Sequence, residues 1–308
     1  MEHRILGRTG LKASVLGFGG APVSFLGTEA AEIERLLNEL LDHGINVIDT
    51  AAMYPGSEEL IGKAVGHRRK EYILVTKCGS GWNKVGDRDW TAEGITKFVD
   101  RSLQRLQTDC IDVMLLHSCD LATLQKGEAL DALVAARDAG KIKFAGYSGD
   151  NEAAAEAVTM PDVAVLETSI SIADQANIDM VLPGAVKHDV GVIVKRPIAN
   201  AAWKPLSEMG SFYAGYAKVY HDRLQAMQLD PAELGFEGPN AWAEMALRFT
   251  LAQPGVHTAI VGTTNRERID ANRRTAGHGL LQGAVIERIR EAFRKAEAGS
   301  GKKWTAQT

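Results

Sequence analysis

Residues Asn46 to Lys63 read NVIDTAAMYPGSEELIGK, a pattern that predicts a strand, a loop and the start of a helix. The apolar run that ends at Asp49 is typical of a buried strand, and Gly56 and Ser57 mark the helix start. One strand end therefore presents the carboxyl of Asp49 and the phenol of Tyr54. Strand-then-helix units build α/β proteins, so the number of further copies decides the fold.

The same alternation continues along the chain. Eight apolar or β-branched runs are SVLGFG at Ser14, NVID at Asn46, YILVTK at Tyr72, DVMLLH at Asp112, KFAGYS at Lys143, VAVLET at Val163, VIVKR at Val192 and HTAIVG at His257. Amphipathic helical patterns lie between them at 29–43, 91–106, 122–139, 175–188, 241–253 and 284–298. Eight strands alternating with helices predict a (β/α)8 barrel of the TIM type, with an open doubly wound sheet as the alternative. Residues 1–12, with turns at Gly7 and Gly10, predict an N-terminal hairpin.

Size and composition limit the possible partners. The 308 residues fit one barrel domain over residues 1–308, although this length also allows two domains. A net charge of -4 with both signs interspersed argues against nucleic-acid binding. Three cysteines without zinc-ligand spacing predict free thiols and no metal site. Without a signal peptide or a run of about 18 apolar residues, no membrane association and a cytoplasmic location are expected. The oligomeric state stays open.

Three connections are longer than a barrel requires, at 78–90, around 118–121 and at 198–240. Long loops at the carboxyl ends of barrel strands are where substrate pockets form. We therefore expect Trp82, Trp90 and the third loop to line a substrate pocket suited to an apolar or flat molecule. The alternative is that the aromatic residues of the third loop only attach an extra helix: Trp203, Phe212, Tyr213, Tyr216 and Tyr220. The tail at 299–308 is expected to be loose, with Trp304 docked.

Ionisable residues end three consecutive predicted strands: Asp49, Lys77 and His117. Taken singly, each has an ordinary explanation, such as a turn cap, a solvated lysine or a core histidine. In a parallel barrel, however, the carboxyl ends of all strands meet at one mouth, and Tyr54 lies just above Asp49. The four side chains are therefore predicted to form one site.

The chemistry of this set follows from its proton affinities. A phenol has a pKa of about 10, so Tyr54 holds a proton that it can donate to a developing alkoxide. Lys77 favours the phenolate, Asp49 pairs with Lys77, and His117 hydrogen-bonds the substrate oxygen. The set thus fits proton delivery to the carbonyl oxygen of a small molecule. No side chain supplies a hydride, so a nicotinamide cofactor is implied.

The chain resembles the aldo-keto reductase family. The resemblance rests on LGRTGLKASVLGFGG, NVIDTAAMYPGSEELIG, LVTK, RSLQRLQTDCIDVMLLH, GKIKFAGYS and IVGTTNRERIDAN, which span most of the chain in the family's order. It implies a (β/α)8 barrel, an NADPH-type cofactor, and a catalytic tetrad of Asp49, Tyr54, Lys77 and His117.

A phosphate site is predicted after the last strand. There, Gly262, Thr263 and Thr264 lead into a helix that begins near Arg266, so free N–H groups, hydroxyls and arginines converge. The resemblance implies that Thr263 and Arg268 hold a 2′-phosphate, which favours NADP(H), although NADH remains possible. It also implies that Asn272 contacts the adenine. The alternative is that the arginines only decorate an exposed helix.

The resemblance also implies a nicotinamide site, with departures from the usual family pattern. Ser148 and Glu167 fall at the carboxamide, and Glu167 replaces the usual glutamine. Lys195 and Arg196 stand where many members stack an aromatic ring, so either a guanidinium stacks there or Lys195 points to solvent. The remaining residues expected at the cofactor are Gly20 and Asp49.

The sequence therefore predicts an NADPH-dependent enzyme that reduces an aldehyde or ketone, with Tyr54 as the proton donor. Two alternatives remain. The same residues can oxidise an alcohol or sugar with NAD(P), or the chain can be a cofactor-binding regulatory or sensor subunit of the same fold.

Overall fold

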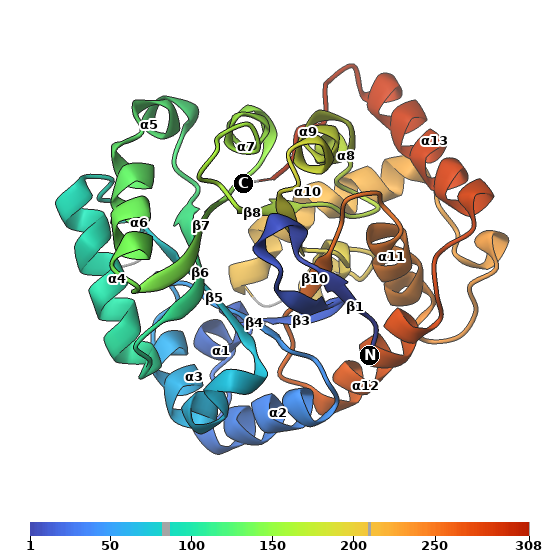
Figure 1. The fold of residues 1–308 in the computed structure, drawn as a ribbon. Helices are drawn as coiled ribbons and strands as arrows, with labels where there is room; N and C mark the ends of the chain where they lie inside the picture. Colours follow the sequence, from blue (N-terminus) through green and yellow to red (C-terminus); the bar gives the residue numbers. More distant parts are fainter. Residues whose placement is uncertain (82–86, 209–210, 308) are drawn as a thin grey trace.

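Eight parallel strands close into a barrel in a computed structural model that describes residues 1–81, 87–208 and 211–307 (Figure 1). The order around the barrel is β10-β3-β4-β5-β6-β7-β8-β9. The strands are β3 (Leu16–Gly19), β4 (Val47–Asp49), β5 (Ile73–Cys78), β6 (Ile111–His117), β7 (Ile142–Ser148), β8 (Val165–Ser169), β9 (Gly191–Lys195) and β10 (Thr258–Val261). Each predicted run supplies one strand, so the barrel prediction is confirmed and the open sheet was the wrong alternative.

Helices surround the barrel (Figure 1). They are α1 (Ala21–Phe25), α2 (Ala30–Asp42), α3 (Ser57–Val65), α4 (Ala92–Leu106), α5 (Leu121–Lys126), α6 (Glu128–Asp138), α7 (Asn151–Ala157), α8 (Ala176–Met180), α9 (Leu182–Lys187), α10 (Ser211–Met227), α11 (Ala241–Leu251), α12 (Arg266–Gly277) and α13 (Gly283–Ser300). Two predicted helices are each divided in two, at 122–139 and 175–188. The first divides at Gly127, whose φ of 82° is left-handed and interrupts the helical backbone.

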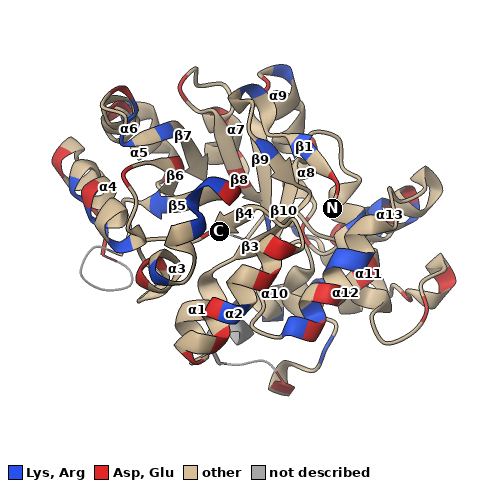
Figure 2. Ribbon diagram, turned by 60° about the horizontal axis from the view of Figure 1, so that its bottom comes forward, with Lys and Arg blue, Asp and Glu red and all other residues tan. Residues whose placement is uncertain are grey.

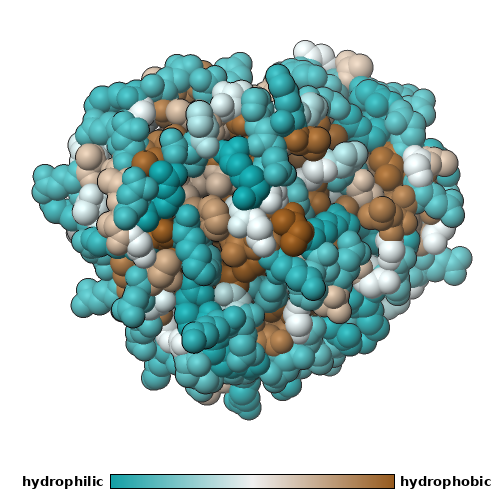
Figure 3. All heavy atoms as spheres, viewed as in Figure 1, coloured by the Kyte–Doolittle hydropathy of each residue, from teal (hydrophilic) through white to brown (hydrophobic). Residues whose placement is uncertain are grey.

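The predicted N-terminal hairpin is present and closes the amino-terminal end of the barrel. Strand β1 (His3–Ile5) pairs with β2 (Lys12–Ser14) in antiparallel register. Leu6 and Ala13 are buried and pack in one cluster with barrel residues such as Val113. Gly7 permits this approach, because its φ is +49° and a Cβ there would lie 2.4 Å from the Gly191 nitrogen. Figure 3 shows this face of the molecule, where hydrophobic residues are scattered among hydrophilic ones.

The two ends of the barrel interior differ in polarity. The strands are buried on both faces, as expected for a parallel sheet covered by helices. Apolar side chains fill the amino-terminal end of the barrel. At the carboxyl end the buried side chains are polar, and they include Asp49, Lys77, Ser148 and Glu167. Burial of such groups requires partners, so this end is the place for a functional site.

The C-terminal tail is bound to the carboxyl end of the barrel, so the expectation of a loose segment at 299–308 was wrong for the described residues. The predicted docking of Trp304 is confirmed: it is 9% exposed, and its ring meets Phe293 edge-on at 5.0 Å. The backbone of Ala306 exchanges two hydrogen bonds with the Asn151 side chain, at 2.8 and 3.0 Å. The tail leaves α13 and ends near α7 (Figure 1). Polar side chains near α7 hold it in place because they form hydrogen bonds with its backbone groups.

Removal of the Trp304 ring should destabilise the protein. We expect Trp304→Ala to lower the free energy of unfolding by about 3 to 5 kcal/mol, because it empties a packed site against Phe293 and Arg223. Urea unfolding followed by circular dichroism measures the change. The matched control is Lys303→Ala, whose side chain is 76% exposed. An equal midpoint shift in both variants would contradict a specific role for Trp304.

Candidate active site

Lys77 lies at the centre of the polar layer. Its Nζ donates to Asp49 Oδ2 at 2.5 Å and to the Thr50 carbonyl at 2.9 Å. A second carboxyl, that of Glu167 on β8, lies 3.1 Å from the same Nζ. All three charged side chains are at most 3% exposed. The predicted pair of Asp49 and Lys77 is therefore present, and a third charged group, which the sequence reasoning placed only at the carboxamide, joins it.

Tyr54 and His117 face this pair across the mouth of the barrel. Tyr54 is held in a tight turn, since its N–H donates to the Ala51 carbonyl and its own carbonyl accepts from the Ser57 N–H. Its ring lies 5.8 Å from Lys77 Nζ and 6.1 Å from the His117 ring, which it meets at 88°. The loop that follows contains Gly56 with φ +74° and leads directly into α3. The four predicted residues thus come together.

The electrostatics of the buried pair depend on both carboxyls. Burial, followed by the negative charge of Glu167, raises the pKa of Asp49 well above its ordinary value, although Lys77 opposes the rise. Burial alone would lower the pKa of Lys77, but the charges of Asp49 and Glu167 outweigh it and raise that pKa. Lys77 is therefore a permanent ammonium.

The two groups that face the pair both hold their neutral forms. Burial raises the pKa of Tyr54 to about 12, despite the opposing effect of Lys77. Burial, and then the positive charge of Lys77, hold the pKa of His117 well below its ordinary value. At neutral pH the cluster therefore offers a phenol with its proton and an uncharged imidazole. His117 Nδ1 is buried and has no hydrogen-bond partner among the described residues.

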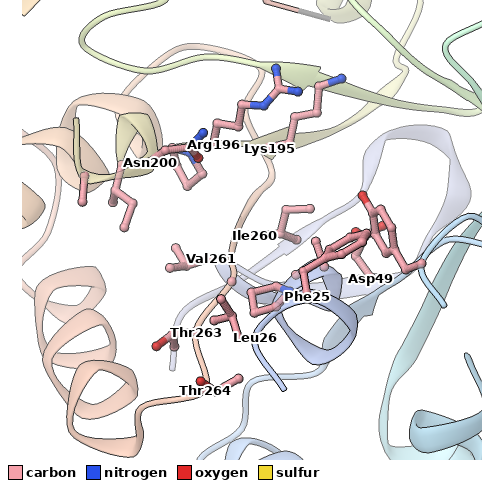
Figure 4. Close-up of a pocket in the computed structure, with 18 of the residues that line it drawn as sticks. Phe25, Leu26, Asp49, Lys195, Arg196, Asn200, Ile260, Val261, Thr263 and Thr264 are labelled. Carbon is pink, nitrogen blue, oxygen red and sulfur yellow. The ribbon is translucent and has the colours of Figure 1, made fainter. Parts of the chain in front are cut away.

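A cleft of about 600 Å³ opens from this cluster. Tyr54, His117 and Asp49 line one part of it, and the loop after β10 lines another. Figure 4 shows Asp49 near Phe25 in the cleft, with Thr263 and Thr264 further along and with Lys195 and Arg196 on the facing side. The cleft therefore joins the cluster to the predicted phosphate site.

The loop after β10 provides the groups predicted for phosphate binding. Gly262, Thr263, Thr264 and Arg268 line the cleft at the N-terminus of α12. Arg266 does not line it: its side chain is 60% exposed and forms an ion pair with Glu39. The arginines do not converge as expected, because Glu39 on α2 holds Arg266 on the outer side of the helix.

Several residues predicted at the nicotinamide also line the cleft. Ser148 Oγ lies 3.4 Å from Glu167 Oε1. Lys195 does not point to solvent, because its Nζ pairs with the buried Asp150 at 3.1 Å. The Arg196 guanidinium donates to Ser169 Oγ at 3.0 Å and to the carbonyl of Gln307 in the tail.

The last two predicted cofactor residues lie outside the residues that line the cleft. Gly20 supports the site from behind, since a Cβ there would lie 2.7 Å from the Asp49 carbonyl oxygen. Asn272 is 9% exposed on α12, one turn beyond Arg268. Contact of either residue with a cofactor stays a prediction.

The third loop lines the cleft as expected, through Ile198, Asn200, Ala201, Lys204 and Glu208. The aromatic part of that expectation was wrong where the structure describes it. Trp90 packs against the core and over Gly79, where a Cβ would lie 1.8 Å from its ring. Trp203 stacks on Trp242 at 5.8 Å, and the Tyr220 hydroxyl donates to Asp174. These rings instead attach the third loop and α10, the alternative stated above. Trp82 lies outside the described residues, as do the side chains of Phe212, Tyr213 and Tyr216.

Sequence reasoning missed the residues that line the mouth beside Tyr54 and His117. Phe25 approaches the Tyr54 ring at 5.9 Å, and the cleft is also lined there by Met53, Arg88 and Ser118. Arg88 and Ser118 belong to long loops that the sequence had indicated. The position of Arg88 and Ser118 on these loops therefore indicated that they could line the cleft, although neither is aromatic.

A barrel with a proton-bearing phenol beside a buried ammonium, and with a helix N-terminus along the same cleft, fits an oxidoreductase that acts with a bound nucleotide. Comparison with known proteins gives the family. A model of the Aldo/keto reductase family matches residues 15–294. The chain therefore belongs to the aldo/keto reductase family and is one of its oxidoreductases.

Individual relatives agree with this assignment. An L-galactose dehydrogenase of Arabidopsis thaliana is 30% identical over 88% of this chain and 87% of its own length. A 6-dehydroglucose reductase of Agrobacterium fabrum is 28% identical over 82% of this chain and 84% of its own. An aldo-keto reductase of Bacillus halodurans, solved in its holo form, superposes with a TM-score of 0.80 at 28% identity, over 95% of this chain and 96% of that one.

Outside the cleft, the features that bear on possible partners are surface charge, the length of apolar helices and groups of metal-ligating residues. Both signs of charge are distributed over the helices in the view of Figure 2. None of the helices within the described ranges is both long and apolar enough to cross a membrane. No group of three or more His, Cys, Asp or Glu in the described part of the chain is arranged to hold a metal ion.

Removal of the Lys77 charge should reveal its role in stability. We expect Lys77→Met to lose about 3 to 5 kcal/mol of unfolding free energy at pH 7, because two buried carboxyls are left without a cation. A carboxyl whose folded pKa is raised binds protons more tightly in the folded state, so its destabilising effect grows as pH rises above about 4. The variant should therefore recover stability from pH 7 to pH 5, as urea unfolding at both values would show.

The control for this experiment is Lys97→Met, whose side chain is 54% exposed. It should change the unfolding free energy by less than about 0.5 kcal/mol at either pH. A Lys77 variant whose loss does not depend on pH would contradict the electrostatic explanation.

Proposed function

We propose that this protein reduces the carbonyl group of an aldehyde or ketone with NADPH. The observation that carries the proposal is the convergence of Tyr54, Lys77, Asp49 and His117 at one end of a cleft whose other end is a helix N-terminus. The bound cofactor supplies the hydride. Tyr54 donates the proton to the carbonyl oxygen, and the adjacent Lys77 ammonium stabilises the phenolate that remains.

His117 and Asp49 have supporting roles in this proposal. The neutral imidazole of His117 hydrogen-bonds the carbonyl oxygen and orients it toward Tyr54, with a ring nitrogen that lacks a partner among the described residues. Asp49 fixes the Lys77 ammonium at 2.5 Å. Burial excludes water from the cluster and thereby strengthens the effect of Lys77 on the phenol.

The residues present fit a phosphorylated nicotinamide cofactor. The N-terminal turn of α12 and its preceding hydroxyls, Thr263 and Thr264, suit a phosphate, and Arg268 supplies a guanidinium for a 2′-phosphate. Ser148 and Glu167 are placed for a carboxamide, and Glu167 Oε2 is buried without a hydrogen-bond partner in the described ranges. These groups favour NADPH over NADH.

Two other functions use the same site. Oxidation of an alcohol or sugar is the reverse reaction, and the likeness to dehydrogenases, including the L-galactose dehydrogenase, favours testing it. A regulatory subunit is favoured by one observation, a 26% identity to a protein of Arabidopsis thaliana named as a probable voltage-gated potassium channel subunit beta, over 95% of this chain and 97% of that protein. The intact proton-donating cluster supports an enzyme instead.

Loss of the Tyr54 hydroxyl should abolish reduction. We expect Tyr54→Phe to lower kcat by about 10²-fold or more while the Kd for NADPH stays within about twofold, because only the proton donor is removed. NADPH oxidation is measured with a panel of aldehydes, ketones and sugars, and binding by fluorescence titration. Tyr72→Phe is the matched control, since its hydroxyl is buried without a hydrogen-bond partner in the described chain and lies away from the cleft. No turnover by the unmodified protein across the panel would favour the regulatory alternative.

The cofactor preference should depend on Arg268 and not on Arg266. We expect Arg268→Ala to weaken NADPH binding by roughly tenfold to a hundredfold, the effect of one charge-assisted phosphate contact, with little change for NADH. Arg266→Ala on the same helix turn should change neither affinity, since that side chain pairs with Glu39. Equal affinity of the unmodified protein for NADPH and NADH would contradict the assignment of Arg268.

A further inference from the structure

The buried cluster contains one carboxyl more than its cation can neutralise. Lys77 Nζ lies 2.5 Å from Asp49 Oδ2 and 3.1 Å from Glu167 Oε2, and the three side chains are almost fully buried. With both carboxyls ionised, the cluster would carry a net charge of -1 away from water. Uncompensated buried charge is costly, and a carboxyl in that position takes up a proton instead.

The contacts within the cluster indicate where such a proton lies. The Asp49 and Glu167 carboxyls both approach the Lys77 ammonium, so two negative charges would meet at one positive charge if both carboxyls were ionised. Glu167 Oε2 lies 3.1 Å from Lys77 Nζ but makes no hydrogen bond to any described residue. A single proton held by this carboxyl pair would leave the cluster neutral.

Glu167 also faces the cleft, beside Ser148, at the end where the nicotinamide is placed by the proposed function. The oxidised nicotinamide ring carries a positive charge and the reduced ring is neutral. A nearby positive charge favours ionised carboxyls, so it opposes the shared proton. We propose that Asp49 and Glu167 share one proton that is released when the oxidised cofactor binds and retained when the reduced cofactor binds. This inference rests on the proposed function.

Among the described residues, the other ionisable groups at this end of the cleft are Tyr54, Lys77, His117 on β6, Lys195 at the end of β9 with its partner Asp150, Arg196 just after β9, and Arg88 at the mouth. Tyr54, with its pKa of about 12, and Lys77, with a raised pKa, keep their protons between pH 6 and 9. His117, with its pKa lowered by burial and by Lys77, stays neutral. Lys195 is paired with Asp150. The pair of Asp49 and Glu167 is therefore the group that would lose a proton when the positively charged, oxidised nicotinamide ring binds nearby.

The test compares the protons released when each nucleotide binds. Calorimetric titrations of the whole protein with NADP⁺ and with NADPH, in buffers of different ionisation enthalpy, give the number released. A 2′-phosphate also titrates, near pH 6, but it contributes equally to both nucleotides, so the difference between them isolates the ring. We expect NADP⁺ to release more protons than NADPH does. As pH rises, the Kd of NADP⁺ relative to that of NADPH should therefore fall, by up to about tenfold per pH unit.

Glu167→Gln should remove this difference, because Asp49 alone is neutralised by Lys77. Glu58→Gln is the matched control: Glu58 is equally buried but contacts Thr76 and Arg105, outside the cleft, so the difference should persist. Equal proton release with both nucleotides in the unmodified protein would overturn the inference, and that comparison does not depend on whether a variant folds. A difference that survives in Glu167→Gln would overturn it as well. Failure of both nucleotides to bind would overturn the proposed function, and this inference with it.

Discussion

A buried ammonium is the constraint on which the carboxyl end of this barrel depends. Lys77 is 1% exposed, so its charge is stable there only because Asp49 and Glu167 lie within 3.1 Å. Those carboxyls come from β4 and β8, on different sides of the barrel, so their meeting at one atom requires a closed sheet. Barrel closure and the charge cluster therefore support each other. Tyr54 and His117 take their properties from this arrangement, because the same burial that confines Lys77 keeps the phenol protonated and the imidazole neutral.

The two ends of the barrel divide stability from chemistry. At the amino-terminal end the hairpin inserts Leu6 and Ala13 against apolar barrel residues. At the carboxyl end, polar groups occupy the interior and the loops open into a cleft. The tail strengthens this second end, since its backbone bonds to Arg196, Asn151 and Asp174. Buried polar groups are rigid only when satisfied, so the tail contributes order where the barrel is least apolar.

The fold and the tetrad were predictable from sequence because both depend on strand ends. A parallel barrel brings every carboxyl end to one mouth, so Asp49, Lys77 and His117 converge once the strands are recognised. The side chains of the loops depend instead on what they pack against. Trp90 covers Gly79 at the other end of its own loop, whereas Arg266 pairs with Glu39 and Lys195 pairs with Asp150, partners that are distant in sequence. Local pattern gives no signal for such pairs, and the substrate side of the cleft was therefore predicted least well.

Glu167 shows how much the choice between a glutamine and a glutamate matters on a barrel strand. An amide at this position would bond a carboxamide without charge, and Asp49 alone would balance Lys77. A carboxyl has the same shape but adds a charge that must be compensated or protonated in a buried site. Both charges reach Tyr54: burial raises the pKa of Tyr54, and the charges of Asp49 and Glu167 add to the rise, while Lys77 opposes it. The acid strength of Tyr54 therefore depends on charges that come from opposite sides of the barrel, on β4 and β8.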